Sequence, residues 1–191
     1  MKSQIESIFK SSINIKQQLL KDINLLERIQ QVVEICTNSI RGDHRIWFCG
    51  NGGSAADAQH LAAELSGRFY LDRAPLFSEA LHVNTSYLTA VANDYSFDEV
   101  YARLIRAKGR QGDVLFGLST SGLSSNILRA FEEAKKQGVI TIALTGATGG
   151  KLKELSNILL KVPSEDTPRI QECHLLIGHI ICELIEREIF K

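Results

Sequence analysis

The sequence predicts an α/β fold in which a parallel sheet is covered by helices on both faces. From Arg45 onward, short continuous apolar runs alternate with helical segments, which is the pattern of repeated β-α units. Before that point, apolar side chains recur at helical spacing. A long final helix opens at Pro168, a residue that is tolerated in a first helical turn. These observations predict a three-layer α-β-α sandwich with a parallel sheet, N-terminal helices and a long C-terminal helix.

Two helices are expected within residues 3–40, and they can pack on the domain or on another subunit because no strand precedes them. The expected strands are Arg45–Cys49, Ser78–Val83 (the weakest), Asp113–Leu118, Val139–Leu144 and Ile158–Val162. The other expected helices are a segment from Ser54, Thr85–Ala92, Asp98–Ala107 and Ser124–Gln137, with a helical turn at Lys151–Leu155. No linker or repeat interrupts this pattern. Residues 1–191 are therefore predicted to form one domain, with residues 1–40 as a helical extension packed on the α/β core.

The composition argues against a function that depends on a large net charge. The 22 Lys and Arg residues equal the 22 Asp and Glu residues in number, so no overall field attracts nucleic acid or an anionic membrane. The four cysteines include no Cys-x-x-Cys pair and lie in apolar or helical contexts, which favours reduced, packed thiols. No apolar run approaches the roughly 20 residues of a membrane span, and the N-terminus lacks an apolar signal core. We therefore expect a cytoplasmic protein.

The stretch from Cys49 to Arg68 has the layout of a phosphate-handling turn. A short strand ends at Cys49, Gly50–Gly53 form a tight turn, and Ser54 is expected to cap the following helix. Glycines let the backbone approach a ligand closely, and the amides at a helix N-terminus attract an anion. Glycine turns between a strand and a helix are also common in α/β folds that bind no phosphate. The turn alone therefore leaves both interpretations open.

Further along the same helix, His60 and Glu64 are four residues apart and project from one face. An imidazole and a carboxylate on one face can share a metal ion or act as an acid and base pair. By spacing alone, such a pair is more often a solvated polar face. Its place on the helix that follows the glycine turn favours a functional role.

A second phosphate signal follows the strand that ends at Leu118. Four hydroxyl residues occupy the next six positions, namely Ser119, Thr120, Ser121 and Ser124. At the carboxyl end of a strand and the amino end of a helix, they can offer hydroxyl groups and backbone amides to a phosphate. The alternative is an ordinary serine cap in a polar turn. The density of hydroxyl groups favours phosphate.

Two nucleotide motifs are matched only in part. Gly50–Ala55 fits the G-x-G-x-x-A dinucleotide pattern, but Asp72 precedes a Pro-containing loop and closes no second strand. Thr145–Leu152 resembles a phosphate-binding Walker loop, but its glycine spacing differs and Leu152 stands where Ser or Thr must hold magnesium. The sequence therefore disfavours a nicotinamide cofactor and nucleotide hydrolysis.

A series of motifs follows in order along nearly the whole chain. They are Cys49–Ser54, the His60 and Glu64 pair, Gly67-Arg68, Asn93-Asp94, Ser119–Ser124, Leu144–Gly146, and Arg169–Glu172 with His179. In type and order they resemble the phosphoheptose isomerases of the sugar isomerase (SIS) domain family. The resemblance implies a homotetramer of α-β-α subunits that interconverts sedoheptulose 7-phosphate and D-glycero-D-manno-heptose 7-phosphate. That reaction supplies bacterial heptose and lipopolysaccharide precursors.

The resemblance also implies roles for individual residues. The sugar contacts are Asn51, Gly52, Gly53, Glu64, Asn93, Asp94 and Gln171, and the phosphate contacts are Ser119, Thr120, Ser121 and Ser124. One Zn²⁺ per subunit is expected on His60, Glu64, Gln171 and His179.

The expected reaction needs a base that moves a proton between adjacent carbons and a second group that handles the oxygen protons. Glu64 is the natural base and His179 the natural acid. Zinc can polarise the substrate carbonyl, but it also competes for the same carboxylate. Its role, catalytic or structural, stays open, and two His, one Glu and one Gln suit several divalent ions.

Gln171 and His179 are eight residues apart on the final helix, roughly 12 Å along its axis and about 80° around it. Convergence on one ion would stretch both side chains. We therefore hypothesise that the metal site is completed at a subunit interface, where the C-terminal helix crosses a neighbour's helix carrying His60 and Glu64. The alternative is that both residues are plain polar positions on an amphipathic helix. His44, His82 and His174 are expected to be surface or core histidines without a role.

A second function belongs to another class. A non-enzymatic, tetrameric SIS-fold adaptor that binds the bacterial replication initiator resembles this chain at Ala90–Asp94 and Asp98–Ala102. In that case the helices would display a partner-binding surface and the pocket would be vestigial. The adaptor lacks counterparts of Glu64 and His179, whereas this chain has both. The chemistry of the site, rather than the shared fold, favours the isomerase.

Overall fold

Five parallel strands form the sheet, in the order β2-β1-β3-β4-β5, in a computed structural model that describes residues 1–191. The strands are β1 (Ile46–Gly50), β2 (Ser78–Ala80), β3 (Val114–Ser119), β4 (Ile140–Thr145) and β5 (Ile158–Lys161). Gly50 pairs with Leu118, and Ser119 pairs with Thr145, so both phosphate-type turns leave the same carboxyl edge. The expected parallel sheet is confirmed, although the weak strand at Ser78–Val83 is reduced to three residues.

The helices follow the expected order. They are α1 (Lys2–Lys21), α2 (Ile23–Arg41), α3 (Gly53–Ser66), α4 (Thr85–Asp94), α5 (Val100–Lys108), α6 (Ser125–Gln137), α7 (Leu152–Leu155) and α8 (Thr167–Ile189). A one-turn 3₁₀ helix (Phe97–Glu99) precedes α5, where a continuous helix from Asp98 is expected from the sequence. None of these helices combines the length and the apolar character that a membrane span requires.

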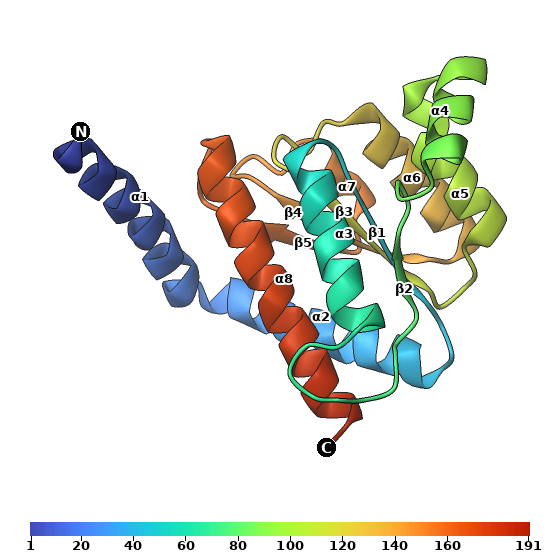
Figure 1. Cartoon of the computed structure of the whole chain (residues 1–191), viewed down its shortest axis with the longest axis horizontal. Coiled ribbons are helices and arrows are strands. Elements are labelled where there is room, and N and C mark those ends of the chain that lie inside the picture. Colours follow the sequence, from blue (N-terminus) through green and yellow to red (C-terminus); the bar gives the residue numbers. More distant parts are fainter.

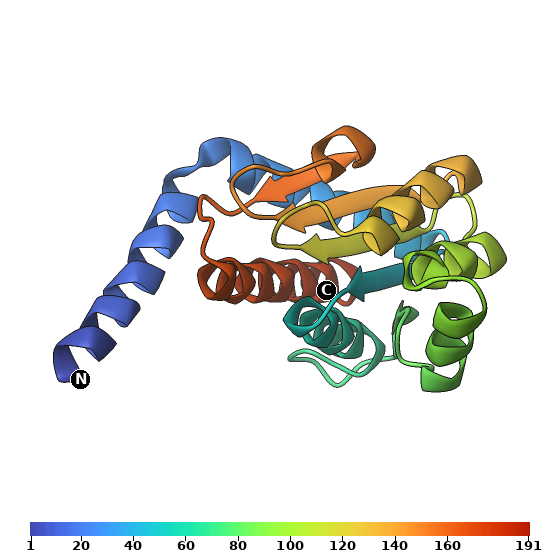
Figure 2. The same ribbon diagram turned by 90° about the horizontal axis from the view of Figure 1, so that it is seen from above.

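Alternate strand residues enter two separate cores. On one face, α2, α3 and α8 cover a core in which Phe48 and Phe116 stack with ring centroids 4.8 Å apart. On the other face, α4 to α7 cover a smaller core around Trp47 and Phe131. Figure 1 shows α3 and α8 side by side, and Figure 2 shows both on the same side of the sheet. The expected three-layer sandwich is confirmed.

The two N-terminal helices differ in how they pack. α2 buries an apolar stripe that includes Leu25, Ile29 and Val33 against the core. α1 buries only Ile15 and Leu19 and extends away from the rest of the molecule (Figures 1 and 2). Its first half leaves four large apolar side chains exposed, namely Ile5, Ile8, Phe9 and Ile13. Only α2 and the end of α1 thus match the expectation of an extension packed on the core.

α3 and α8 run in the same direction, because Gly53 lies beside Gln171 at one end and Leu61 lies beside Gly178 further along. A Cβ atom at Gly178 would lie 2.4 Å from Leu61 Cδ1. Leu61 is buried, so a side chain at Gly178 would displace it within a packed core. The glycine therefore lets the two helices approach each other closely.

His174 belongs to the core. Of the two alternatives expected for this residue, surface or core, the structure shows the second. Its side chain has no exposed surface, and this burial lowers its pKa to about 4. His44 and His82 are only partly buried. His174 therefore stays neutral in the folded protein at pH values where an exposed histidine is already charged.

This burial predicts a loss of stability in mild acid. The unfolded chain protonates His174 near its ordinary pKa of 6.5, whereas the folded chain does so only near 4. The stabilising contribution is present above pH 6.5 and is lost as the pH falls toward 4. Between pH 7 and pH 5, urea denaturation should show a drop in unfolding free energy that is roughly 2 kcal/mol larger for the wild type than for His174→Gln. Asn24→Ala, at an exposed position that does not titrate, is the control and should keep the wild-type pH dependence. Equal drops in the wild type and His174→Gln would contradict the prediction.

Candidate active site

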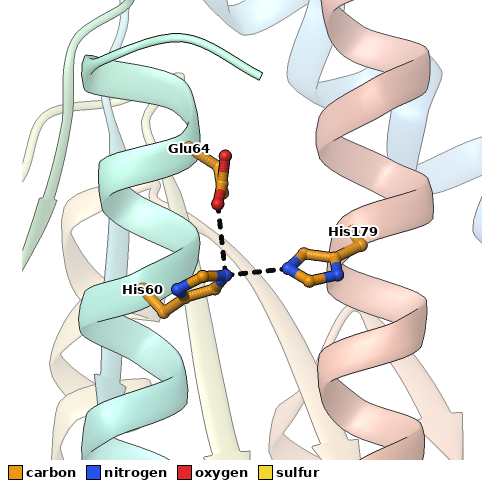
Figure 3. A group of neighbouring side chains, drawn as sticks. All are labelled: His60, Glu64 and His179. Carbon is orange, nitrogen blue, oxygen red and sulfur yellow. Dashed lines mark hydrogen bonds and ion pairs between the residues drawn. The ribbon is translucent and has the colours of Figure 1, made fainter. Parts of the chain in front are cut away.

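His60, Glu64 and His179 form a cluster between α3 and α8 (Figure 3). His60 Nε2 lies 2.8 Å from His179 Nε2 and 3.2 Å from Glu64 Oε1. One ligand atom from each residue can be chosen so that all lie within 4.8 Å of one another. Two imidazoles and a carboxylate at this spacing are a donor set that suits a divalent transition metal such as zinc.

Helix geometry explains the cluster. His60 and Glu64 are one turn apart on α3, and His179 follows Gly178, which lies against Leu61 of α3. The Phe69 ring, on the loop after α3, packs edge-on against the His179 ring with centroids 5.7 Å apart. His179 thus has α3 on one side and an aromatic ring on another.

All three members of the cluster come from one chain. The hypothesis that the C-terminal helix of a neighbour brings His179 to His60 and Glu64 is therefore corrected, since this chain's own α8 already does so. The parallel packing of α3 and α8 is the physical reason, and the spacing of Gln171 and His179 on one helix could not reveal it.

Gln171 lies apart from the other expected metal ligands. Its side-chain amide packs against Gly53, and its Nε2 lies 3.4 Å from Ser54 Oγ at the start of α3. His60 is seven residues further along that helix, roughly 10 Å away. Within one chain, the expected set of four therefore divides into a cluster of three and a glutamine at the glycine turn.

The glycine turn differs from the expectation in its cap. α3 begins at Gly53, its N-cap is Gly52 with φ 55°, and no side chain caps it. The expected capping role of Ser54 is wrong, because Ser54 lies inside the first turn and is buried. The positive φ explains why glycine is required at position 52. Backbone amides, rather than a serine hydroxyl, therefore form this end of the helix.

The hydroxyl residues after β3 also gather at the carboxyl edge of the sheet. Ser119 Oγ lies 3.1 Å from Ser124 Oγ and accepts a hydrogen bond from the Gly122 N–H. Ser121 Oγ accepts from the Leu123 N–H. Thr120 and Ser121 line a cleft together with Thr148, Ser164 and Thr167, and no Lys or Arg lines it. The loop offers neutral donors to an anion.

Asn51 joins the two turns. Its side-chain amide and that of Asn126, in the first turn of α6, exchange two hydrogen bonds of 2.8 and 2.9 Å. Asn126 is almost fully buried. This reciprocal pair holds the glycine turn beside the hydroxyl loop, a role that is invisible from Asn51 alone because its partner is 75 residues away.

Asn93 and Asp94 stand apart in the single chain. Both are exposed at the end of α4, and the Asn93 side chain donates to Asp94 Oδ1 at 3.0 Å. The two side chains bond to each other, rather than to the cluster or the hydroxyl loop.

Sequence reasoning missed a buried ion pair next to the cluster, formed by Arg73 and Glu186. Arg73 stands in a loop with no periodic pattern. Glu186 is seven residues after His179, a spacing that places it on the same helix face, and this spacing was the available signal.

Comparison with known proteins agrees with this geometry. The family model for the SIS domain matches residues 9–146, and the chain therefore belongs to the SIS domain family. Phosphoheptose isomerases from Sulfurimonas denitrificans and Aneurinibacillus thermoaerophilus are each 50% identical to it, covering 100% of this chain and 97% and 96% of theirs.

Solved structures give the same result. The phosphoheptose isomerase GmhA from Neisseria gonorrhoeae superposes with a TM-score of 0.91 at 43% identity, covering 97% of this chain and 98% of that chain. One from Francisella tularensis gives 0.92 at 37% identity, with 97% of each chain covered. Within the SIS domain family, this chain is thus a member of the phosphoheptose isomerases, which are sugar-phosphate isomerases. The expected enzyme class is confirmed over the adaptor.

The Asn51 and Asn126 pair generates a prediction. Asn126→Ala leaves the buried side of the Asn51 amide without its partner, so the free energy of unfolding should fall by about 1–3 kcal/mol. Urea denaturation measures the change. Asn24→Ala, at an exposed position of α2, is the matched control and should change it by less than about 0.5 kcal/mol. A loss no larger than that of the control would show that the pair does not hold the two turns together.

Proposed function

We propose that this enzyme interconverts sedoheptulose 7-phosphate and D-glycero-D-manno-heptose 7-phosphate, and so supplies bacterial heptose and lipopolysaccharide precursors. The observation that carries the proposal is the His60, Glu64 and His179 cluster, a base and an acid held together on adjacent helices. The hydroxyl loop after β3 supports it as a phosphate site. The names of the close relatives supply the class of substrate.

In this proposal, Glu64 takes the proton from carbon 1 of the ketose and returns it to carbon 2 of the enediol. His179 gives a proton to the carbonyl oxygen on carbon 2, and it regains a proton from the hydroxyl on carbon 1 as the aldehyde forms. Carboxylate and imidazole are 3.2 Å and 2.8 Å from the same His60 nitrogen, which is close enough for both to reach one pair of adjacent carbons.

His60, Glu64 and His179 fit Zn²⁺ by donor type and spacing. Bound there, zinc would polarise the carbonyl and stabilise negative charge on the enediolate oxygen. We assign Gln171 as the fourth ligand, supplied by a neighbouring subunit, because in its own chain it lies at the glycine turn instead.

The phosphate is assigned to Ser119, Thr120, Ser121 and Ser124. Asn51, Gly52, Gly53, Asn93, Asp94 and Gln171 are assigned to the sugar. Hydroxyl groups and the amides of two helix N-termini can bind a phosphate through fixed dipoles without a cation.

The dimensions of a single chain favour a site that subunits share. The Asn51 and Asn126 pair sets the hydroxyl loop beside the start of α3, whereas Glu64 is eleven residues further along that helix, roughly 16 Å. Six carbon–carbon bonds and the C–O and O–P bonds of the phosphate ester, each about 1.5 Å long, together span less than about 12 Å. A heptose phosphate held by one subunit would therefore present its reacting carbons to the Glu64 of another.

We propose a homotetramer as the assembly that creates these shared sites. The exposed apolar side chains of α1, among them Ile8 and Phe9, need a cover. An open groove between α2 and α8, lined by Leu26, Ile29 and Ile180 among others, is available on the same molecule. A second copy of the chain provides both surfaces at once.

The proposed reaction predicts that purified protein turns over sedoheptulose 7-phosphate and that Glu64→Gln lowers kcat by at least about 100-fold, since the amide cannot take up the proton. A chelator should lower the turnover of the wild type, and added Zn²⁺ should restore it. Glu132→Gln, an exposed carboxylate on α6, is the control and should retain wild-type activity. A folded wild type that is inactive with Zn²⁺ present would exclude the proposed function and favour the adaptor.

The shared site predicts complementation between two inactive variants. Glu64→Gln disables the cluster, and Ser121→Asp repels the phosphate from an exposed position in the hydroxyl loop. Random mixed tetramers of the two should regain up to about a quarter of wild-type turnover, because that fraction of interfaces combines an intact loop with an intact cluster. Mixing after unfolding and joint refolding provides the measurement. No recovery would show that each chain holds a complete site by itself.

A further inference from the structure

Arg73 and Glu186 form the most deeply buried ion pair of the molecule. Their side chains are 3% and 2% exposed, and Arg73 Nε donates to Glu186 Oε2 at 2.9 Å. Burying such a pair costs a large desolvation penalty, so a pair of this kind contributes little stability compared with apolar residues of similar volume. The contacts that each partner makes point to another role.

Arg73 holds the carboxyl end of α3. Its guanidinium donates to the carbonyl oxygens of Glu64 at 2.9 Å, Leu65 at 2.7 Å and Gly67 at 3.0 Å. The last carbonyls of a helix have no partner within the helix, so Arg73 caps this end. One of the capped carbonyls belongs to Glu64 itself, the proposed base. Its backbone is thus fixed by a side chain on the following loop.

Glu186 holds that loop. Its carboxylate accepts from three successive backbone N–H groups, those of Phe69, Tyr70 and Leu71, at 2.8–3.0 Å. Although burial raises the pKa of Glu186, these donors and Arg73 lower it to about 2, so the carboxylate stays charged at working pH. Phe69, whose N–H it binds, is the residue whose ring packs on His179.

We propose that Arg73 and Glu186 are positioning residues for the catalytic cluster. The pair links the three parts that carry the cluster: Arg73 binds the Glu64 backbone on α3, Glu186 fixes Phe69 against His179, and Glu186 itself stands two turns after His179 on α8. It sets the spacing of α3 and α8 at the point where the Glu64 carboxylate and the two imidazoles must bind the same metal ion. The inference rests on the catalytic role assigned to that cluster.

The test uses three variants of the full-length protein. Arg73→Lys keeps the charge but loses the planar set of donors that reaches several carbonyls at once. Phe69→Leu leaves every buried charge in place and removes the ring contacts of Phe69 with His179 and Tyr70. Arg106→Lys is the matched control, because Arg106 pairs with the nearly buried Glu133 at 3.0 Å on the opposite face of the sheet.

Three quantities are measured on each variant below its melting temperature: kcat and KM for sedoheptulose 7-phosphate, the dissociation constant for Zn²⁺ by competition with a chelator, and the histidine ring NMR signals of the metal-free protein. Arg73→Lys should lower kcat and weaken Zn²⁺ binding, each by about 10- to 100-fold, with KM within about threefold. Phe69→Leu should change them in the same direction by a smaller factor. Arg106→Lys should match the wild type within about twofold.

A folded Arg73→Lys protein with kcat and Zn²⁺ affinity within about twofold of the wild type would overturn the proposal. If Arg73→Lys does not fold, Phe69→Leu decides in the same way. Should the wild type itself be inactive and bind no Zn²⁺, the function proposed above fails instead. The histidine signals then decide, because positioning requires that the His60 and His179 signals shift in Arg73→Lys and stay unchanged in Arg106→Lys.

Discussion

The parallel packing of α3 against α8 is the constraint on which the site depends. The two helices are about a hundred residues apart in the sequence, since α3 ends at Ser66 and α8 begins at Thr167, yet they lie side by side on one face of the sheet and touch where Gly178 meets Leu61. Because they run in the same direction, each turn of one faces a fixed turn of the other. His60 and Glu64 thereby meet His179, and Gln171 is left with the glycine turn.

The site has two parts along this helix pair. At the carboxyl edge, the Asn51 and Asn126 amides tie the glycine turn to the hydroxyl loop, the proposed phosphate site. The cluster lies further down the helices, and Glu64 is eleven residues after the start of α3. In the shared site proposed above, a neighbouring subunit would bring the two parts together and so connect assembly to catalysis.

Much of this fold follows from local pattern. The apolar runs at β3 and β4 and the helical spacing of α6 predict their elements almost to the residue, because buried parallel strands and amphipathic helices have distinct periods. The i,i+4 pair on α3 is equally local. What the sequence could not show depends on contacts across the chain: the partner of Asn51, the role of Arg73, and the glycine cap that replaces Ser54. The requirement for glycine at position 52 could be recognised only from the φ angle of that residue.

α1 carries a consequence for how the protein behaves on dilution. A 20-residue helix exceeds the roughly 12–15 residues below which isolated helices are marginal, yet few contacts hold this one: Ile15 and Leu19 are buried, and Ser12 donates to Glu172 at 2.7 Å. In the proposed homotetramer, a second copy would cover Ile8 and Phe9 and bind the helical form in preference to the disordered one, so the order of α1 would follow mass action. The protease resistance of this segment would then rise with protein concentration.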